Sequence, residues 1–352
     1  MIFLGILLLV VGFVLLIKGA DWFVDGAAGV AAKLRVPQLV IGLTIVAFGT
    51  SAPELATSVS SAAQQKVGFA MGNVLGSNIC NILLILGLSA MIAVLPVQKE
   101  SLRLDFPVLL GTSALIVFFG YTGNEIARWE GAIMVVLLIA YTGFLIWNAL
   151  RQRKKEGTMA ALNDHEVLSE TEEGKKSKFA IWYDTMKEKF WFLIVVTVVG
   201  LGIVVGGSTI AVEGAKMIAI ELKIPENIMG LTVVAFGTSL PELITSVVAA
   251  KKGETDIAIG NIIGSNIFNI LFVAGLSAVI FPLPYKYFLV EENIWVDFTI
   301  DGYITLGVAA LLALFAYLPG HKLKKWQGWV LFLGAIAYYT YCVLVSTKVI
   351  VI

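Results

Sequence analysis

The sequence predicts an all-α polytopic membrane protein, with ten transmembrane helices arranged as two inverted-topology five-helix repeats. Hydrophobic residues make up 58% of the 352 residues and charged residues only 14%, whereas a soluble domain has about 25% charged residues. Apolar runs long enough to cross a bilayer recur along the chain. The run Gly42–Val59, GLTIVAFGTSAPELATSV, returns in the second half at Gly230–Val247 as GLTVVAFGTSLPELITSV.

Each apolar run is expected to be a membrane-spanning helix, because a helix needs about 20 residues to cross a bilayer. The runs do not alternate with polar residues, which argues against a β-barrel. The first run lacks a basic leader and is expected to stay as a helix rather than be removed as a signal peptide. The expected span centres lie near Val14, Ser51, Cys80, Leu115, Leu138, Val205, Ser239, Phe268, Ala310 and Ala337.

The distribution of Lys and Arg predicts how the chain lies in the membrane. The odd-numbered connections between spans hold 18 of these 25 residues, and the even-numbered connections with the C-terminus hold 5. Since cytoplasmic connections are enriched in Lys and Arg, both termini are expected outside the cell. The chain then divides into a first five-helix repeat (1–150), a solvated cytoplasmic linker (151–189) and a second five-helix repeat (190–352), all in the plasma membrane.

The repeat extends beyond this first motif. GNVLGSNICNIL from Gly72 returns as GNIIGSNIFNIL from Gly260, in the same register as the first pair of motifs. Because each unit holds an odd number of spans, the second copy enters the bilayer from the opposite side. Inverted repeats are typical of secondary transporters, whose substrates bind near the bilayer midplane between the repeats. Two opposed copies can give one site two access routes.

The second expected helix combines a helix breaker with a carboxylate. Pro53 has no N–H for the carbonyl of Gly49, so the helix is expected to break or kink between residues 47 and 53. Glu54 shares a helix face with Thr50 and Ser58, four positions away on either side. A carboxylate at membrane depth is expensive and indicates a functional site. A cluster of oxygen ligands without sulfur or imidazole suits hard cations such as sodium and calcium.

The second repeated motif adds further oxygens. Ser77 and Asn81 lie one helical turn apart in the third expected helix, and packing against the second helix would bring them opposite Glu54. Gly72 and Gly76 form a GxxxG pair, which we assign to close helix packing rather than to ligands. The second copy repeats the arrangement through Ser265, Asn269, Gly260 and Gly264.

Other interpretations of these residues stay open at this point. Ser51 and Glu54 could form a capping box that opens a helix, although the long apolar flanks argue against a surface loop. Asp21, Asp25 and Glu213 are also ionisable and fall within expected helices. They could line an ion path or lie in wide aqueous vestibules, and the sequence does not decide between the two.

Composition narrows the classes of function. A net charge of zero gives no argument for a nucleic-acid partner, and no protein partner is indicated. Cys80 and Cys342 lie in apolar runs and suggest no disulfide. His165 and His321 fall in polar connections, so neither a histidine metal site nor a serine–histidine catalytic set is expected at membrane depth. The chain is therefore not expected to be an enzyme or to carry a cofactor.

The motifs GTSxPEL and GNxxGSNIxNI, each present twice, resemble the alpha repeats of the sodium/calcium exchanger family, within the cation/calcium antiporter superfamily. The resemblance covers both repeats and implies sodium/calcium antiport, with about three sodium ions exchanged for each calcium ion. Glu54 and Glu242 look like the central carboxylates of the site, with further ligands around them. The further ligands it implies are the carbonyls of Ala47, Thr50, Ala235 and Thr238, the hydroxyls of Ser51, Ser77, Ser239 and Ser265, and the amides of Asn81 and Asn269.

One departure from the family pattern bears on ion selectivity. Some members carry Asp where this chain has Asn81 or Asn269, and an Asp in the second repeat is associated with potassium co-transport. Its absence here argues against potassium dependence and leaves two central carboxylates. The runner-up interpretation is a proton/calcium antiporter of the same superfamily, a branch that usually carries a GNxxE-type motif instead of GTSxPE. A passive cation channel is a further alternative from another class.

Overall fold

The structure, a computed structural model, describes residues 2–160, 186, 189–222, 235–289 and 294–346. Within this part of the chain the architecture is helical, with only short strand pairs, which confirms the predicted all-α fold. Eight described helices are long and apolar enough to cross a membrane, and a ninth span is formed if the bent pair Gln38–Thr50 and Ala52–Ala63 is counted. The predicted span around Ser239 would begin in residues 223–234, outside the described residues.

The helices of the first half follow the predicted order, with the second and third spans subdivided. They are α1 (Ile2–Leu34), α2 (Gln38–Ile41), η1 (Gly42–Val46), α3 (Ala47–Thr50), α4 (Ala52–Ala63), α5 (Val67–Cys80), η2 (Asn81–Leu86), α6 (Gly87–Ile92), α7 (Lys99–Arg103), α8 (Asp105–Gly123) and α9 (Arg128–Ala160). The elements labelled η are π-helical turns, which are wider than α-helical turns and are often found at functional sites.

The second half repeats this order. Its described helices are α11 (Phe190–Glu221), α13 (Ala235–Thr238), α14 (Leu240–Lys252), α15 (Thr255–Phe268), η4 (Asn269–Ala274), α16 (Gly275–Ile280), α17 (Thr299–Tyr317) and α18 (Lys325–Ser346). The strands of both halves are β1 (Leu95–Pro96), β2 (Glu125–Ile126), β3 (Leu283–Pro284), β4 (Lys286–Leu289), β5 (Ile294–Asp297) and β6 (Lys322–Leu323).

Polar and apolar residues are distributed as expected for a protein surrounded by lipid. Large apolar side chains are exposed along the outer helices, for example Val14 of α1, Val136 of α9 and Leu333 of α18. Polar side chains in the interior are instead fully buried, for example Glu54 of α4, Asn78 of α5, Glu242 of α14 and Asn261 of α15. In water this arrangement would expose large apolar patches, whereas in a bilayer it places the apolar surface against hydrocarbon. The chain is therefore a multi-pass membrane protein.

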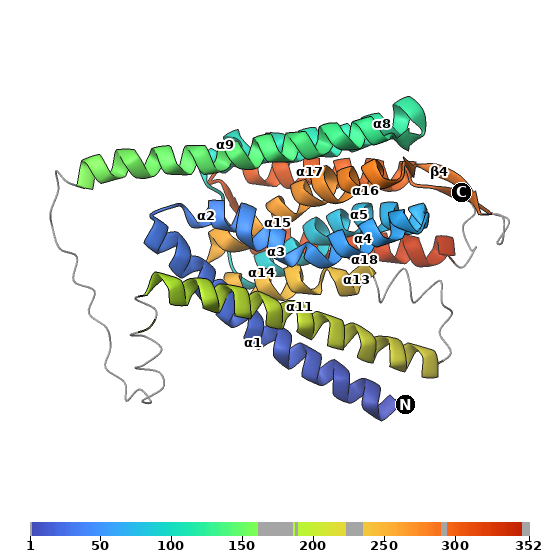
Figure 1. Ribbon diagram of the computed structural model, residues 1–352, viewed down its shortest axis with the longest axis horizontal. Coiled ribbons are helices and arrows are strands. Elements are labelled where there is room, and N and C mark those ends of the chain that lie inside the picture. The colour runs from blue at the N-terminus through green and yellow to red at the C-terminus, as the bar shows by residue number, and fades with distance from the viewer. Residues whose placement is uncertain (1, 161–185, 187–188, 223–234, 290–293, 347–352) are drawn as a thin grey trace.

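Helices α1 and α11 form a close antiparallel pair at one side of the molecule (Figure 1). Their backbones nearly touch where glycines face each other. A Cβ at Gly12 would lie 2.5 Å from the backbone nitrogen of Ala211, and a Cβ at Gly207 would lie 2.8 Å from that of Leu16. Such contact between backbones fixes the two helices to each other. The pair is therefore one structural unit, packed against α14 and the helix breaks.

The two repeats interleave and are not separate lobes. Helix α6 of the first half packs on α18 of the second, and α16 of the second packs on α9 of the first. Two strand pairs join the halves in the same crossed way, since β1 pairs with β6 and β2 pairs with β3. β4 pairs with β5 within the second half. Any site between the repeats is therefore built from both of them.

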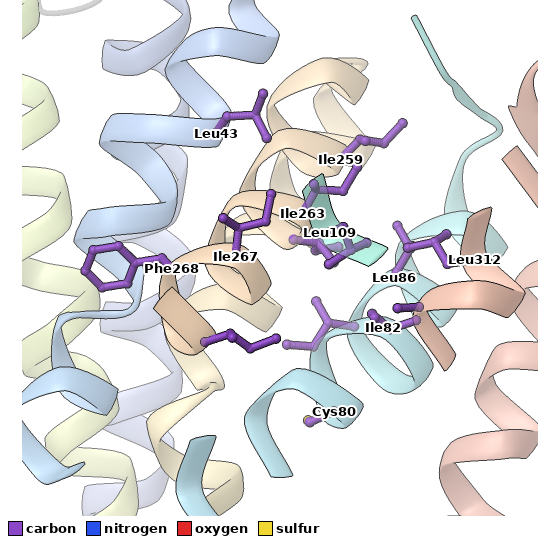
Figure 2. Close-up of a cluster of buried hydrophobic side chains, with 14 of the residues drawn as sticks. Leu43, Cys80, Ile82, Leu86, Leu109, Ile259, Ile263, Ile267, Phe268 and Leu312 are labelled. Atoms are coloured by element: carbon purple, nitrogen blue, oxygen red, sulfur yellow. The ribbon is translucent and has the colours of Figure 1, made fainter. Parts of the chain in front are cut away.

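The buried apolar core lies between these crossed helices. Figure 2 shows Leu43 of η1, Ile263 of α15 and Leu109 of α8 within a single cluster. Helix α15 passes through the middle of the molecule, and nearly all of its side chains are buried. Its packing on η1 and α3 brings the second repeat directly against the helix break of the first.

Candidate cation site

The predicted helix breaks are present in both repeats. Helix α3 ends at Thr50, Ser51 adopts a turn conformation with φ −83° and ψ 6°, and α4 then begins. The two segments are bent by 47° at this point. In the second repeat Ser239 has φ −86° and ψ 2° between α13 and α14. Pro53 and its counterpart Pro241 lie in the first turn that follows, where a proline without an N–H is tolerated.

The two carboxylates lie just after these breaks and are fully buried. Glu54 and Glu242 are each in the first turn of their half-helix, and each has 0% exposed surface. No Lys or Arg forms a salt bridge with either carboxylate among the described residues. Burying an unpaired carboxylate is strongly unfavourable, so this pair needs compensating positive charge from a bound ion or proton.

Each carboxylate receives a hydrogen bond from the serine of the opposite repeat. Ser51 Oγ donates to Glu242 Oε1 at 2.8 Å, and Ser239 Oγ lies 3.2 Å from Glu54 Oε1. Ser239 Oγ is also 3.3 Å from Ser77 Oγ. These contacts bring five of the predicted site residues together. They also show that the closest partner of each carboxylate comes from the other repeat, rather than from the third helix of its own repeat as expected.

Several buried oxygens at this centre have no hydrogen-bond partner among the described residues. They include Oε2 of Glu54, Oε2 of Glu242 and Oγ of Ser265. The side-chain oxygens and nitrogens of Asn81 and Asn269 are also buried without a partner in this part of the chain. Buried polar atoms in proteins are normally satisfied, so a set of such oxygens fits a site for cations. Carboxylate, amide and hydroxyl oxygens are the ligands that hard cations prefer.

The π-helical turns place the predicted asparagines. Asn81 follows the last residue of α5 and begins η2, and Asn269 follows α15 and begins η4. Both residues have 0% exposed surface. The sequence motif predicted these residues but not the widened turns, since nothing in the residue pattern distinguishes a π-helical turn from an α-helical one.

The predicted carbonyl ligands belong to α3 and α13, the short helices that directly precede the breaks. The Ala47 carbonyl accepts a hydrogen bond from the Ser51 N–H at 3.0 Å, so the break does not free this oxygen from the helix. Ala235 is the first described residue of α13. Thr50 and Thr238 end their half-helices directly before the break.

The capping function considered for Ser51 is absent. Ser51 and Ser239 occupy the N-cap positions of α4 and α14, but neither side chain makes a capping hydrogen bond to its own helix. Both hydroxyls point across to the opposite repeat instead. The capping box considered for Ser51 and Glu54 is therefore wrong in this structure, because the Glu242 carboxylate of the opposite repeat accepts the hydrogen bond of the Ser51 hydroxyl.

Sequence reasoning missed two asparagines at this centre. Asn73 and Asn261 occupy the second position of the repeated GNxxGSN motif and are 4% and 0% exposed. Each accepts a hydrogen bond from a predicted site threonine, Asn73 from Thr238 at 3.2 Å and Asn261 from Thr50 at 3.0 Å. Their occurrence at the same position of both copies was the signal that could have found them.

Comparisons with known proteins agree with this geometry. The sequence model of the family described as "Sodium/calcium exchanger protein" matches residues 4–147 and 192–345. The chain is 34% identical to the sodium/calcium exchanger MaX1 of Methanosarcina acetivorans in an alignment of 360 positions, gaps included, that covers 96% of this chain and 98% of that protein. It is 37% identical to the putative antiporter CaxA of Alkalimonas amylolytica over 275 residues, covering 77% of this chain and 79% of that protein.

A solved structure shows the same fold. The sodium-calcium exchanger NCX_Mj, soaked with Na⁺ and Sr²⁺, superposes on this chain with a TM-score of 0.77 at 31% sequence identity. The superposition covers 97% of this chain and 99% of that one. Together with the matched family model and the buried, duplicated oxygen cluster, this shows that the chain is a cation/calcium antiporter, a transport protein, and belongs to the sodium/calcium exchanger family.

Proposed function

We propose that this antiporter exchanges sodium for calcium by alternating access, and that Glu54 and Glu242 are the shared ligands of both ions. The observation that supports this most directly is the pair of fully buried carboxylates, each with one oxygen bonded to a serine of the opposite repeat and one without a partner in the described chain. The ions are the transported substrates, and no resident cofactor takes part. The remaining proposed ligands are the side chains and carbonyls of Thr50, Thr238, Ser51, Ser239, Ala47, Ala235, Ser77, Ser265, Asn81 and Asn269.

Charge balance explains why the two ions would compete and why the exchange would be electrogenic. Two carboxylates neutralise one Ca²⁺, so the calcium-loaded site has no net charge. About three Na⁺ ions leave a net charge of about +1 on the same ligands, so one cycle would move charge across the membrane. Because both loads use the same two carboxylates, they exclude each other. That exclusion would couple the two fluxes.

The fold offers a route for alternating access. The α1/α11 pair is a single unit that packs across both helix breaks, beside Gly49 through Leu201 and beside Gly237 through Val212. Sliding of this unit along the breaks would open the site first to one side and then to the other. We assign both termini to the outside of the plasma membrane and residues 151–189 to the cytoplasm, as the positive-inside rule predicts. In this topology residues 1–150 and 190–352 form the two repeats.

A proton/calcium exchange is the second candidate, and the same geometry supports it. Two neighbouring buried carboxylates with unpartnered oxygens can also be neutralised by protons. The hydroxyls of Ser51 and Ser239, by contrast, suit sodium, because proton coupling needs only the carboxylates. The identity of the driving ion therefore separates the two candidates.

An outward sodium gradient is expected to drive radioactive calcium into vesicles that contain the purified protein. The flux should stop when sodium is replaced by choline and should rise when the membrane potential favours movement of the excess positive charge. Calcium uptake driven by a pH gradient in the complete absence of sodium would contradict sodium coupling. A passive channel would show no acceleration by sodium on the opposite side.

Replacing either carboxylate by its amide is expected to abolish exchange. Glu54→Gln and Glu242→Gln keep the side-chain shape but remove one of the two charges that calcium requires, so calcium flux should fall at least about 100-fold. Glu130→Gln is the matched control, because Glu130 is also buried, at 5% exposed, but caps the start of α9 through the Ala127 N–H. If both site variants transported calcium at the rate of the control, the site assignment would be wrong.

A further inference from the structure

Asn73 and Asn261 join the two repeats, because the nitrogen and the oxygen of each side-chain amide contact different repeats. The Asn73 amide nitrogen donates to Ser58 Oγ at 2.9 Å and to the Glu54 carbonyl at 3.3 Å, both in its own repeat. Its oxygen accepts from Thr238 Oγ1 of the other repeat. An amide is the side chain that offers two donors and an acceptor from one planar group.

The second asparagine makes the same contacts with the repeats exchanged. The Asn261 amide nitrogen donates to Ser246 Oγ at 2.9 Å and lies 3.5 Å from the Glu242 carbonyl. Its oxygen lies 3.0 Å from Thr50 Oγ1, whose single hydrogen can also be donated to the Val46 carbonyl at 3.1 Å. Because the same contacts occur in both repeats, they are a regular feature of the site and not a chance contact. Asn73 therefore connects α4, which carries Glu54, to Thr238 at the end of α13. Asn261 connects α14, which carries Glu242, to Thr50 at the end of α3.

We propose that Asn73 and Asn261 are positioning residues of the ion site, which hold Thr238 and Thr50 in place across the repeat boundary. This inference rests on the proposed sodium/calcium exchange. Thr238 directly precedes Ser239, whose hydroxyl reaches Glu54. Without the amide, Thr238 would lose the hydrogen bond that anchors it to α5, although Ser239 would still contact Ser77 there. The neutral oxygens around Thr238 would then be held less firmly. Glu54 would lose the bond from Asn73 to its carbonyl, but α4 also packs on α5 and α16, so its carboxylate would move less than Thr238.

Sodium and calcium should respond differently to that loss. In the proposed exchange, one calcium ion has both carboxylates to itself, whereas about three sodium ions share the same two. The sodium-loaded site therefore depends more on well-placed carbonyl and hydroxyl oxygens. Loss of the anchor should weaken sodium binding more than calcium binding.

Asn73→Ala is expected to raise the KM for sodium about fivefold and to change the KM for calcium by less than about twofold, in sodium-dependent calcium flux. Thr238→Val, which removes the hydroxyl but keeps the shape and the backbone carbonyl, should produce the same shift. In the Thr238→Val background, Asn73→Ala should add no further increase in the KM for sodium. The corresponding pair in the other repeat is Asn261→Ala with Thr50→Val.

Ser113→Ala is the control. Ser113 is equally buried, in α8, but its hydroxyl donates to its own helix, at the Leu109 carbonyl. This variant should lower thermal stability without changing the ratio of the two KM values. Equal shifts in both KM values for Asn73→Ala, or additive effects with Thr238→Val, would overturn the positioning role. Sodium-dependent calcium flux by the unaltered protein would still support the proposed exchange.

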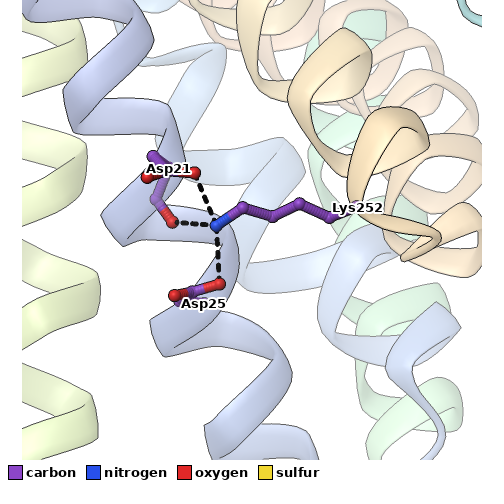
Figure 3. Close-up of polar contacts among 3 residues, drawn as sticks. All are labelled: Asp21, Asp25 and Lys252. Atoms are coloured by element: carbon purple, nitrogen blue, oxygen red, sulfur yellow. Dashed lines mark hydrogen bonds and ion pairs between the residues drawn. The ribbon is translucent and has the colours of Figure 1, made fainter. Parts of the chain in front are cut away.

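A second inference comes from the end of α14 that the positive-inside rule assigns to the cytoplasm. Figure 3 shows Lys252 reaching from α14 to two aspartates on α1. Its Nζ lies 2.6 Å from Asp21 Oδ1, 2.6 Å from Asp25 Oδ1 and 2.9 Å from the Asp21 carbonyl. This cluster connects the α1/α11 unit to a helix that carries one of the site carboxylates. Asp21 and Asp25 thus have a cationic partner in the structure.

The equivalent positions in the other half do not reproduce this contact. In the register that aligns Glu54 with Glu242, Asp25 corresponds to Glu213 and Lys252 to Gln64. Glu213 pairs with Lys216 of its own helix at 2.8 Å, and Gln64 donates to Ser60 of its own helix. Ser208 adds to the asymmetry, since its hydroxyl donates to the Gly237 carbonyl at 2.8 Å, whereas its counterpart is Ala20.

We infer that Lys252, Asp21 and Asp25 form a latch that stabilises one of the two access states. Two perfectly matched inverted repeats would make the inward-open and outward-open states similar in energy. Ion pairs that are present in only one half of the molecule make one of these states more stable than the other. This inference also rests on the proposed alternating access, and it concerns the distribution of the protein between states rather than ion binding itself.

Lys252→Met is expected to shift the apparent calcium affinity in opposite directions on the two membrane faces. An apparent dissociation constant varies inversely with the fraction of protein that faces the ion. Partly exposed ion pairs are weak, so each KM should change about two- to fivefold, one upward and one downward. The measurement is the KM for calcium at each face, in right-side-out and everted membrane vesicles.

Two further variants make this test decisive. Lys216→Met is the control, because its pair with Glu213 stays within α11, and it should leave both KM values unchanged. Exchanging the charges in Lys252→Asp with Asp25→Lys should restore part of the original asymmetry. If Lys252→Met shifted both KM values in the same direction, or neither, there would be no latch, although sodium-dependent flux in the unaltered protein would still support exchange.

Discussion

The whole structure depends on two carboxylates that are buried without a cationic side chain. Glu54 and Glu242 are removed from water, and no ion pair compensates them in the described chain. Such a pair is tolerated only if something positive can enter, and if the surrounding oxygens are already in place to share it. These oxygens come from the helix breaks, from the two serines that bond the carboxylate of the opposite repeat, and from the buried amides. The unfavourable burial of the two charges is thus inseparable from their use as a cation site.

Interleaving of the repeats follows from the same requirement. One copy of the motif provides a glutamate and a break, but the hydroxyl that bonds each glutamate comes from the other copy. The crossed packing of α6 on α18 and of α16 on α9 fixes the copies in opposite orientations around this centre. The polar interior and the apolar exterior then both follow from the bilayer, which penalises unsatisfied polar groups far more than apolar surface.

Much of this could be predicted from the sequence, for identifiable reasons. Pro53 and Glu54 lie within an apolar run that occurs twice, and the physics of proline and of charge in a membrane made both the break and the site predictable. The crossed serines and the role of Asn73 were not predictable, because they depend on contacts between segments from opposite halves of the chain. The pairing of Asp21 with Lys252 likewise joins the two halves and has no periodic signal of its own.

Competition between the two ions for the purified protein tests the central claim most directly. If Glu54 and Glu242 serve both ions, sodium must displace bound calcium completely, with a steep dependence on sodium concentration and a Hill coefficient above about 1. Calcium should displace sodium reciprocally. Equilibrium binding of radioactive calcium over a range of sodium concentrations measures this. Calcium that remains bound at saturating sodium would show that the ions occupy separate ligands, and would contradict the account of one shared pair of carboxylates.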